Sequence, residues 1–297
     1  MVLRYMGNGP YCTANSLSVI FGDAGPGPAT LEVLSGTPFG IAIHGDNITY
    51  FTPSRWNPEF GMNNAMDLLG WECDRIFGSA EESIAVLRRA TPDAPVLAGP
   101  VEMGLLPYVP GIGQAIGADH NVVVIGMEGD MIRAHDVQGW PFVTVPLDAF
   151  LATWQGNTFA YQADAYAVRS NFRQARKVDP HTALRDSIPR SLELLDPAES
   201  ADAAERAAKL IEAGLSNMQY KYFVEFQIQA GARRLADAAV LFAEIGANRS
   251  AAVLERQAKL IGSLQYLMTT QQNAESAEVF RQLAPTYGEL RDELLEV

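Results

Sequence analysis

The residue composition of the chain changes near Asp179-Pro180, and this change limits the fold to two parts. Up to about residue 178 the chain is rich in Gly, Pro and aromatic residues, and turn sequences such as GDAGPGP, SGTPFG and VPGIG separate short apolar runs. That texture is typical of α+β structure. Beyond it Ala, Leu, Glu, Gln and Arg dominate, as they do in helices. We therefore predict an α+β domain over residues 1–178 and an all-helical domain over residues 179–297.

Apolar residues in the second part recur at helical spacing. Gly246 and Asn248 lie between two such stripes, where one helix can end and the next can be capped. The pattern predicts a helical bundle. The stripes are Leu235, Ala238, Phe242 and Ile245, then Leu254, Ala258, Ile261, Leu264 and Met268.

Composition and charge exclude several classes of protein. Apolar residues make up 48% of the chain and charged residues 19%, which suits a sizeable core. Acidic residues outnumber basic ones by 35 to 22, and a net charge of -13 argues against nucleic-acid binding. The sequence has neither a signal-peptide core nor a run of about 18 apolar residues, so we expect a cytoplasmic protein with no membrane partner.

Two cysteines cannot form a disulfide framework, and a reducing compartment keeps both as thiols. Cys73 fits a small buried hydrophobe. Cys12 is different, because apolar residues from Ala14 to Ile20 predict a helix that begins near it. The positive end of a helix favours a thiolate, and its free N–H groups can bind an oxyanion.

A cysteine nucleophile needs a base and a group that orients the base. His120 opens the apolar run NVVVIGM, and MIRAHDV follows after a turn at Glu128-Gly129-Asp130, which predicts a hairpin. Preceding it, PVLAGPV predicts another buried strand. A three-residue turn would place His120 opposite Gln138 and put Asp136 diagonally on the same face, with His135 on the other face. A two-residue turn would reverse this parity.

The order of these groups resembles that in papain-like peptidases of the bacteriocin-processing type. The chain more closely resembles the N-terminal domain family of butirosin biosynthesis protein H. The similar blocks are YCTANSLSVIFG, SGTPFGI, AMDLLGWECDR, PVLAGPVEMGLLPY, DHNVVVIGME, IRAHDVQGW and VPLDAFLATW, spread over roughly residues 8 to 155. The resemblance implies a papain-like fold for the first domain.

The same resemblance implies an enzyme and assigns Cys12, His120 and Asp136 to its catalytic triad. The expected reaction moves an acyl group from a carrier-protein thioester, on phosphopantetheine, to an amine acceptor in secondary-metabolite biosynthesis. No bound cofactor is expected. Hydrolysis of a peptide or amide by the same triad is the alternative, and a decayed, non-enzymatic scaffold is a third hypothesis. The cysteines and histidines lack metal-binding spacing, so we expect no metal.

The chain departs from the papain-like pattern at the oxyanion site, and further residues are candidates for substrate binding. Met6 stands where papain-like enzymes usually have an oxyanion-binding Gln, so Asn8 is the substitute candidate. Glu102, Tyr108 and His44 are candidates for substrate binding. Tyr108, together with Trp140 and Phe142, could instead belong to the core, which is the favoured interpretation.

A basic run lies between the two predicted domains and consists of Arg169, Arg173, Arg176 and Lys177. An acidic carrier protein could dock there despite the net negative charge of the chain. The competing interpretation is a solvated linker or a helix face paired with acidic residues of the bundle. The helical domain also offers a surface for homo-oligomer formation.

Overall fold

The computed structural model divides into two compact units. The division does not fall at the single boundary expected after residue 178. The difference arises because residues 29–69 pack with the C-terminal helices. The first unit comprises Met1–Pro28 and Gly70–Lys177, and the second Ala29–Leu69 and Val178–Val297. The structure describes residues 10–44, 48–111, 113–159 and 161–297.

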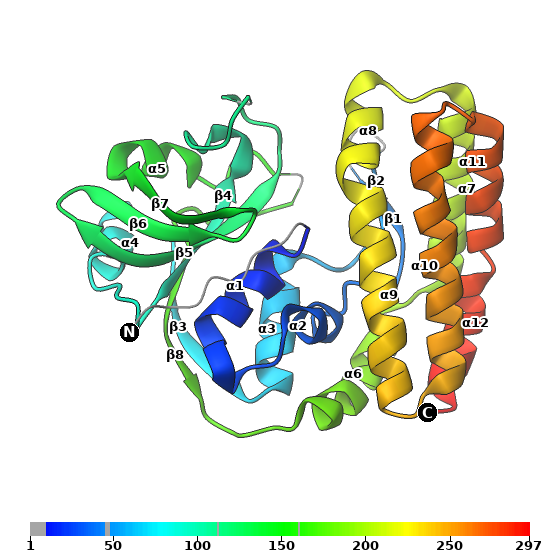
Figure 1. Ribbon diagram of the computed structural model, residues 1–297, viewed down its shortest axis with the longest axis horizontal. Coiled ribbons are helices and arrows are strands. Elements are labelled where there is room, and N and C mark those ends of the chain that lie inside the picture. Colours follow the sequence, from blue (N-terminus) through cyan, green and yellow to red (C-terminus); the bar gives the residue numbers. More distant parts are fainter. Residues whose placement is uncertain (1–9, 45–47, 112, 160) are drawn as a thin grey trace. The chain divides into compact units, whose positions relative to one another are not determined.

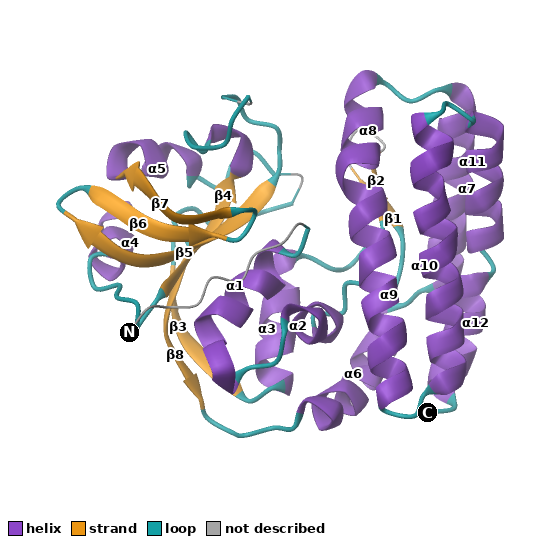
Figure 2. Cartoon of the chain, in the orientation of Figure 1, coloured by secondary structure: helices purple, strands orange, loops and turns teal. Residues whose placement is uncertain are grey.

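The first unit is built around a six-stranded antiparallel sheet in the order β3-β8-β4-β5-β6-β7 (Figures 1 and 2). All three strands expected from apolar runs are confirmed, as is the helix beginning at Cys12. The strands are β3 (Trp71–Ile76), β4 (Val96–Glu102), β5 (Asp119–Glu128), β6 (Met131–Asp136), β7 (Trp140–Pro146) and β8 (Val168–Gln174). The helices are α1 (Cys12–Phe21), η1 (Gly22–Ala24), α4 (Ala80–Leu87), η2 (Met103–Leu105) and α5 (Leu147–Thr153).

The core of this unit follows from the period-two alternation of the strands. Val122 and Val124 of β5 project to one face, where they are fully buried. Helices α4 and α5 contribute Leu87 and Phe150 to the same apolar cluster. Helix α1 packs against β5 as well (Figure 1). The central strand that carries His120 is therefore held on several sides.

The second unit is mainly helical (Figure 2). Its N-terminal segment supplies α2 (Pro28–Leu34), β1 (Ala42–His44), β2 (Ile48–Tyr50) and α3 (Pro58–Leu68). Its C-terminal part supplies α6 (Pro180–Leu194), α7 (Pro197–Ala213), α8 (Asn217–Tyr222), the π-helical η3 (Phe223–Gln227), α9 (Ile228–Glu244), α10 (Asn248–Thr269), α11 (Asn273–Leu283) and α12 (Thr286–Leu295).

The helix boundaries have local causes. Asp179 accepts a hydrogen bond from the Thr182 N–H and caps α6, and Asp196 caps α7 in the same way. The two predicted stripes are buried apart from Ala258, which is half-buried. Asn248 is the first residue of α10 and provides no cap.

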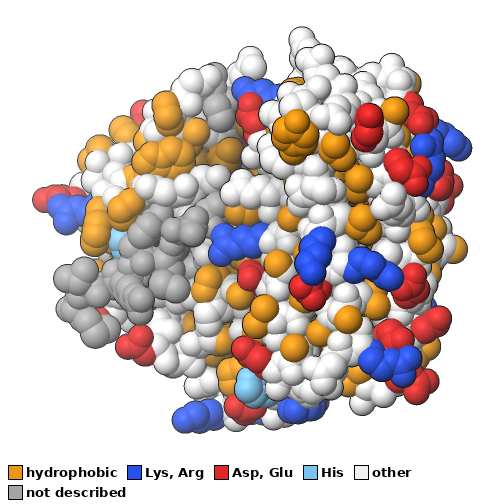
Figure 3. Space-filling model, turned by 45° about the vertical axis from the view of Figure 1, so that its right-hand side comes forward, with side chains coloured by type: hydrophobic (Ala, Val, Ile, Leu, Met, Phe, Trp, Pro, Cys, Tyr) orange, Lys and Arg blue, Asp and Glu red, His pale blue; other side chains and the backbone are white. Residues whose placement is uncertain are grey.

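A buried ion pair ties the N-terminal segment of the second unit to its helices. Glu32 of α2 contacts Arg234 of α9 at 2.6 Å, and both side chains are at least nine-tenths buried. Other ion pairs on this unit are exposed, for example Lys259 with Glu255. Figure 3 shows acidic and basic side chains lying beside one another on the visible face. None of the helices in the described ranges is both long and apolar enough to cross a membrane.

Candidate active site

Cys12 is the first residue of α1 and is half-buried. Tyr11 occupies the N-cap position without a side-chain cap, so the N–H groups of the first turn have no side-chain acceptor at the cap. The next residue, Thr13, accepts a hydrogen bond from the Asn121 amide at 3.1 Å. This bond ties the start of α1 to β5 next to His120.

The register between β5 and β6 differs from the expected one near the turn but agrees with it at the site. Glu128 pairs with Met131, so the turn has two residues rather than three. A β-bulge between Val124 and Gly126 then adds one residue to β5. Because the bulge compensates for the shorter turn, Val122 pairs with Asp136, as the predicted register requires. His120, two residues before Val122, lies on the same face as Asp136.

His120 and Asp136 form a buried hydrogen-bonded pair. The His120 Nε2 lies 2.8 Å from Asp136 Oδ1, and the two side chains are 2% and 0% exposed. Asp136 Oδ1 also accepts the backbone N–H of Gln138 at 2.8 Å, and Oδ2 accepts the Tyr108 hydroxyl at 2.9 Å. Since Nε2 is engaged by Asp136, Nδ1 is the ring nitrogen left for the sulfur of Cys12.

The electrostatics of the pair favour a protonated His120 and an ionised Asp136. Burial by itself lowers the pKa of His120, but the charge and hydrogen bond of Asp136 outweigh burial, and Cys12 adds a hydrogen bond and a charge interaction. Together they raise the pKa of His120 to about 10. Burial raises the pKa of Asp136, yet the charge and hydrogen bond of His120, with bonds from Gln138 and Tyr108, hold that pKa below its ordinary value. An imidazolium next to a carboxylate is the favoured state.

Two further bulges shape the strands around the pair. On β4, the register shifts between Ala98 and Val101, and a Cβ on Gly99 would lie 2.3 Å from Asn121 Oδ1 and 2.8 Å from the His120 carbonyl oxygen. Only glycine allows β4 to approach His120 so closely. Gly99 was not among the residues predicted for the site.

On β7, the extra residue falls at Phe142, which has a φ of 57°. Its N–H donates to His135 Nδ1 at 3.2 Å, and the two rings meet edge-on. His135 is fully buried, and it faces away from Asp136 as expected from the alternation. The bulge brings Trp140 opposite Asp136.

The aromatic side chains near the pair differ in burial. Tyr108 and Trp140 are half-buried, pack against the core and meet edge-on, with ring centroids 6.0 Å apart. Phe142 is 58% exposed, so the preference for a core position is wrong for this residue. Burial, followed by the charge of Asp136 and the hydrogen bond to it, raises the pKa of Tyr108, which keeps its hydroxyl a donor.

The other predicted site residues are not brought to Cys12, His120 and Asp136 by contacts that the structure describes. The Glu102 carboxylate is 1% exposed and accepts three backbone N–H bonds, so it is occupied by its own loop. His44 belongs to the second unit, where its ring packs against Tyr50, and burial lowers its pKa despite the charge of Glu199. Asn8 lies outside the described residues.

Two of the four residues of the basic run, Arg169 and Arg173, lie on β8, and both have partners on β3. Arg169 is 6% exposed and donates to Cys73 Sγ at 3.3 Å. Arg173 forms ion pairs with Glu72 and Asp74 of the neighbouring strand. Neither a linker nor a helix face therefore describes these two residues. Arg176 and Lys177 are exposed.

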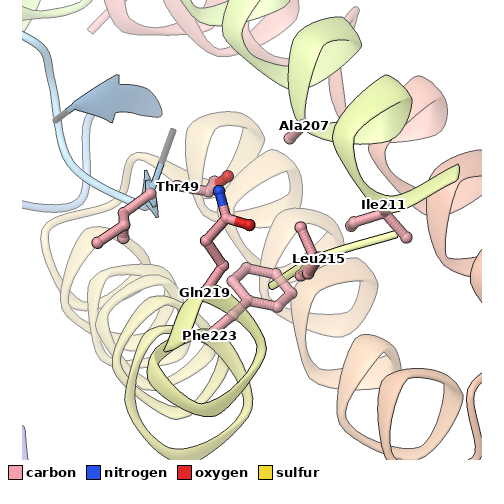
Figure 4. Close-up of a pocket in the computed structure, with 7 residues that line it drawn as sticks. Thr49, Ala207, Ile211, Leu215, Gln219 and Phe223 are labelled. Carbon is pink, nitrogen blue, oxygen red and sulfur yellow. The ribbon is translucent and has the colours of Figure 1, made fainter. Parts of the chain in front are cut away.

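The second unit contains a small hollow. Gln219 and Phe223 project into it from α8 and η3, near Ile211 and Leu215 (Figure 4). The space open to the centre of a water molecule measures about 10 Å³, room for roughly one water. Its lining residues carry no ionisable group. Over the described ranges, no group of three or more His, Cys, Asp or Glu side chains could hold a metal ion.

The described residues thus form an α+β region followed by an all-helical region. The α+β region has a buried His–Asp pair on neighbouring strands and a cysteine at the start of a helix. The family model described as "YobF C-terminal domain" matches residues 197–295, which span α7 to α12. Over its whole length, the chain is similar to "Uncharacterized protein YobF" of Bacillus subtilis (strain 168). The two are 27% identical over 308 residues, which cover 100% of this chain and 99% of that protein.

Proposed function

We propose that the first unit is a papain-like cysteine acyltransferase similar to the butirosin biosynthesis protein H N-terminal domain family. The observation that carries the proposal is the joining of Cys12, at the first turn of α1, to a buried His120–Asp136 pair. A buried imidazolium beside a cysteine stabilises the thiolate, which is the nucleophilic form. Asp136 fixes the ring and its charge, as the third member of a triad does.

The acylation step follows from this arrangement. The Cys12 thiolate attacks the carbonyl carbon of an acyl thioester, and the negative charge moves to the carbonyl oxygen. Collapse of this intermediate breaks the donor C–S bond, and the leaving thiolate takes the proton from the His120 imidazolium. The products are an acyl-Cys12 thioester, a free pantetheine thiol and a neutral imidazole.

The second step regenerates the enzyme. The amine of the acceptor attacks the acyl-Cys12 carbonyl, and neutral His120 takes the proton that the nitrogen loses. The bond between the acyl carbon and Cys12 breaks, giving an amide and the original thiolate–imidazolium pair. Exchange of one thioester for another in the first step is nearly balanced in free energy, whereas formation of the amide drives the second step forward.

The oxyanion requires donors close to Cys12. Backbone N–H groups at the start of α1 suit this role, because the helix end carries partial positive charge. A second donor from Asn8 stays a prediction. A role in secondary-metabolite biosynthesis rests on the family resemblance alone, as does the carrier-bound donor.

The location of the carrier follows from local charge. Because Arg169 is only 6% exposed, whereas Arg176 and Lys177 are exposed, we assign docking of an acidic carrier mainly to Arg176 and Lys177. Replacing both with Glu should slow transfer from a carrier-bound thioester more than transfer from the free pantetheine thioester. Exposed charges are screened over about 10 Å at 0.1 M salt, so added salt should reproduce this difference. Equal slowing of both donors would remove the docking assignment.

Intact-mass spectrometry tests the proposal directly. The protein is incubated with a panel of acyl-pantetheine thioesters, and the acylated residue is located by peptide mapping. Cys73→Ser should retain the adduct, and Cys12→Ser should lose it. An adduct on Cys73, or no adduct with any donor, would contradict the proposal.

The acceptor distinguishes transfer from hydrolysis. The acyl-Cys12 form is isolated and mixed with a panel of primary amines, and the amide and the free acid are measured together. A transferase should convert acyl-Cys12 mainly to amide, because its site must exclude water from the intermediate. Release of free acid at a rate that no amine changes would identify a hydrolase with the same triad.

A further inference from the structure

We propose that Tyr108 is a fourth member of the site, a positioning residue that fixes Asp136, and that Glu102 sets Tyr108 in place. The inference rests on the proposed function in so far as Cys12 is the reacting group. It replaces the substrate-binding role expected for both residues.

The contact between Tyr108 and Asp136 is specific. The Tyr108 hydroxyl donates to Oδ2 at 2.9 Å, while Oδ1 receives His120 and the N–H of Gln138. Both oxygens of the carboxylate are therefore engaged, and the carboxylate cannot rotate without breaking a bond. Hydrogen bonds to an ionised group are roughly twice as strong as those between neutral groups. The half-buried Tyr108 ring packs against Trp140, which lies opposite Asp136 on β7.

Tyr108 reaches Asp136 from the loop between β4 and β5. The described residues of this loop, 103–111 and 113–118, are called the arch below. Leu106 and Val109 of the arch are buried in the core cluster on either side of Tyr108. The arch thus leaves the sheet, inserts two apolar anchors and returns to the strand that carries His120.

Glu102 closes the arch at its base. Its Oε1 accepts the N–H groups of Gly104 and Ile116, each at 3.1 Å, and Oε2 accepts that of Gly117 at 3.0 Å. One buried carboxylate therefore joins the first residues of the arch to its last ones. The Met103 N–H adds a bond to the Ala118 carbonyl at 2.9 Å. Three backbone donors on a carboxylate leave it little capacity for a substrate.

The arrangement predicts a pH-dependent effect. The Tyr108 hydroxyl favours ionised Asp136, ionised Asp136 favours the His120 imidazolium, and the imidazolium favours the Cys12 thiolate. Without the hydroxyl, Asp136 takes up a proton at higher pH and loses its fixed orientation. The thiolate should then disappear at higher pH than in the wild type. At alkaline pH the thiol ionises without help, so little difference should remain there.

The experiment measures the alkylation rate of Cys12 by iodoacetamide as a function of pH, in a Cys73→Ser background. Tyr108→Phe keeps the ring and removes only the hydroxyl. We expect its acid limb to move to higher pH by about half a unit or more, about a threefold slower reaction on that limb, with the alkaline rate retained. Tyr166→Phe is the matched control, since Tyr166 packs against the same core cluster, and it should leave the profile unchanged.

Glu102→Gln tests the second part of the inference. The amide places an N–H₂ group among backbone donors, which should loosen the arch and shift the acid limb in the same direction. In the Tyr108→Phe background it should add little, because both changes act through one hydroxyl. A full additional shift would show that Glu102 acts independently of Tyr108.

Other outcomes separate this inference from the proposed function. An acid limb in Tyr108→Phe that coincides with the wild type overturns the inference, and so does equal slowing at every pH, which indicates a general structural effect. A wild-type Cys12 with no acid limb below that of a free thiol overturns it as well. If the limb shifts as expected but no acyl donor ever labels Cys12, the positioning role stands and the acyltransferase proposal fails.

Discussion

Asp136→Asn is the substitution that most directly tests the electrostatics of the site. The amide has nearly the same shape and keeps an acceptor oxygen, but the negative charge is lost. Burial then dominates, and it lowers the pKa of His120. The pKa should fall from about 10 to below 6.5. At about 1.4 kcal/mol for each pKa unit, the free energy by which the fold favours the His120 imidazolium should fall by on the order of 5 kcal/mol, an upper limit for this buried pair.

The two proteins should differ in how their unfolding free energy depends on pH. In the wild type, the raised pKa of His120 stabilises the folded state fully below pH 6.5, and that contribution is lost as pH rises through about 10. In Asp136→Asn, a lowered pKa makes the folded state less stable as pH falls through 6.5. The difference in unfolding free energy between the two proteins should therefore be larger near pH 6 than near pH 10.

Two measurements check this prediction. The imidazole of His120 is titrated by long-range ¹H–¹⁵N NMR and assigned with substitutions of the other histidines, of which the chain has three. Unfolding free energies are measured by urea denaturation across the same pH range. Asp130→Asn is the control, because it removes an 80% exposed carboxylate from the same hairpin and should change neither result by much.

The reasoning would be refuted by a His120 in the wild type that titrates at or below 6.5. It would also be refuted if Asp136→Asn left that titration near 10. In either case the charge of Asp136 would not be the source of the imidazolium.

Two further predictions concern the packing on which the site depends. Gly99→Ala should destabilise the protein by about 2 kcal/mol or more and displace His120, because the new Cβ meets backbone at 2.8 Å. Gly129→Ala, whose new Cβ meets nothing within 4 Å, should cost only about 1 kcal/mol of backbone strain, and urea denaturation with thiol alkylation compares the two variants. Glu32→Ala leaves Arg234 buried and unpaired and should cost about 3–5 kcal/mol, whereas Lys259→Ala removes an exposed pair and should change the unfolding free energy by less than about 1 kcal/mol. Similar losses of unfolding free energy for the two glycine variants, or for Glu32→Ala and Lys259→Ala, would contradict the reasoning from packing and burial.

Local patterns predicted the elements well because each depends on neighbouring residues. The apolar run after His120 is β5, and the helix beginning at Cys12 follows from the spacing of Ala14 to Ile20. Spacing also identified the buried stripes of the C-terminal helices. The same patterns missed the packing of residues 29–69 with those helices, since the contacts that decide it are far apart in sequence. Glu32 and Arg234, for example, are separated by 202 positions.

The register at the site shows where sequence reasoning reached its limit. A three-residue turn was the wrong premise for a correct pairing of Val122 with Asp136, because a two-residue turn and a bulge near Gly126 compensate. A bulge depends on how a strand fits its neighbours on both sides, and no local pattern marks it. Tyr108 was likewise expected at a substrate pocket or in the core, and its contact with Asp136 exists because the folded arch brings its hydroxyl to β6.

The sequence by itself determined the α+β character of the first part and the helical character of the second. It also determined the helix at Cys12, the hairpin of His120 and Asp136, and the net charge. These depend on residue type and short spacing, which set local backbone preference and burial. Only the tertiary structure decided that Glu102 is a buried anchor, that Arg169 and Arg173 are already paired, and that Asp136 has Tyr108 as a partner. A polar side chain can serve a ligand or its own fold, and the choice is made by which donors and acceptors the folded chain brings within about 3 Å.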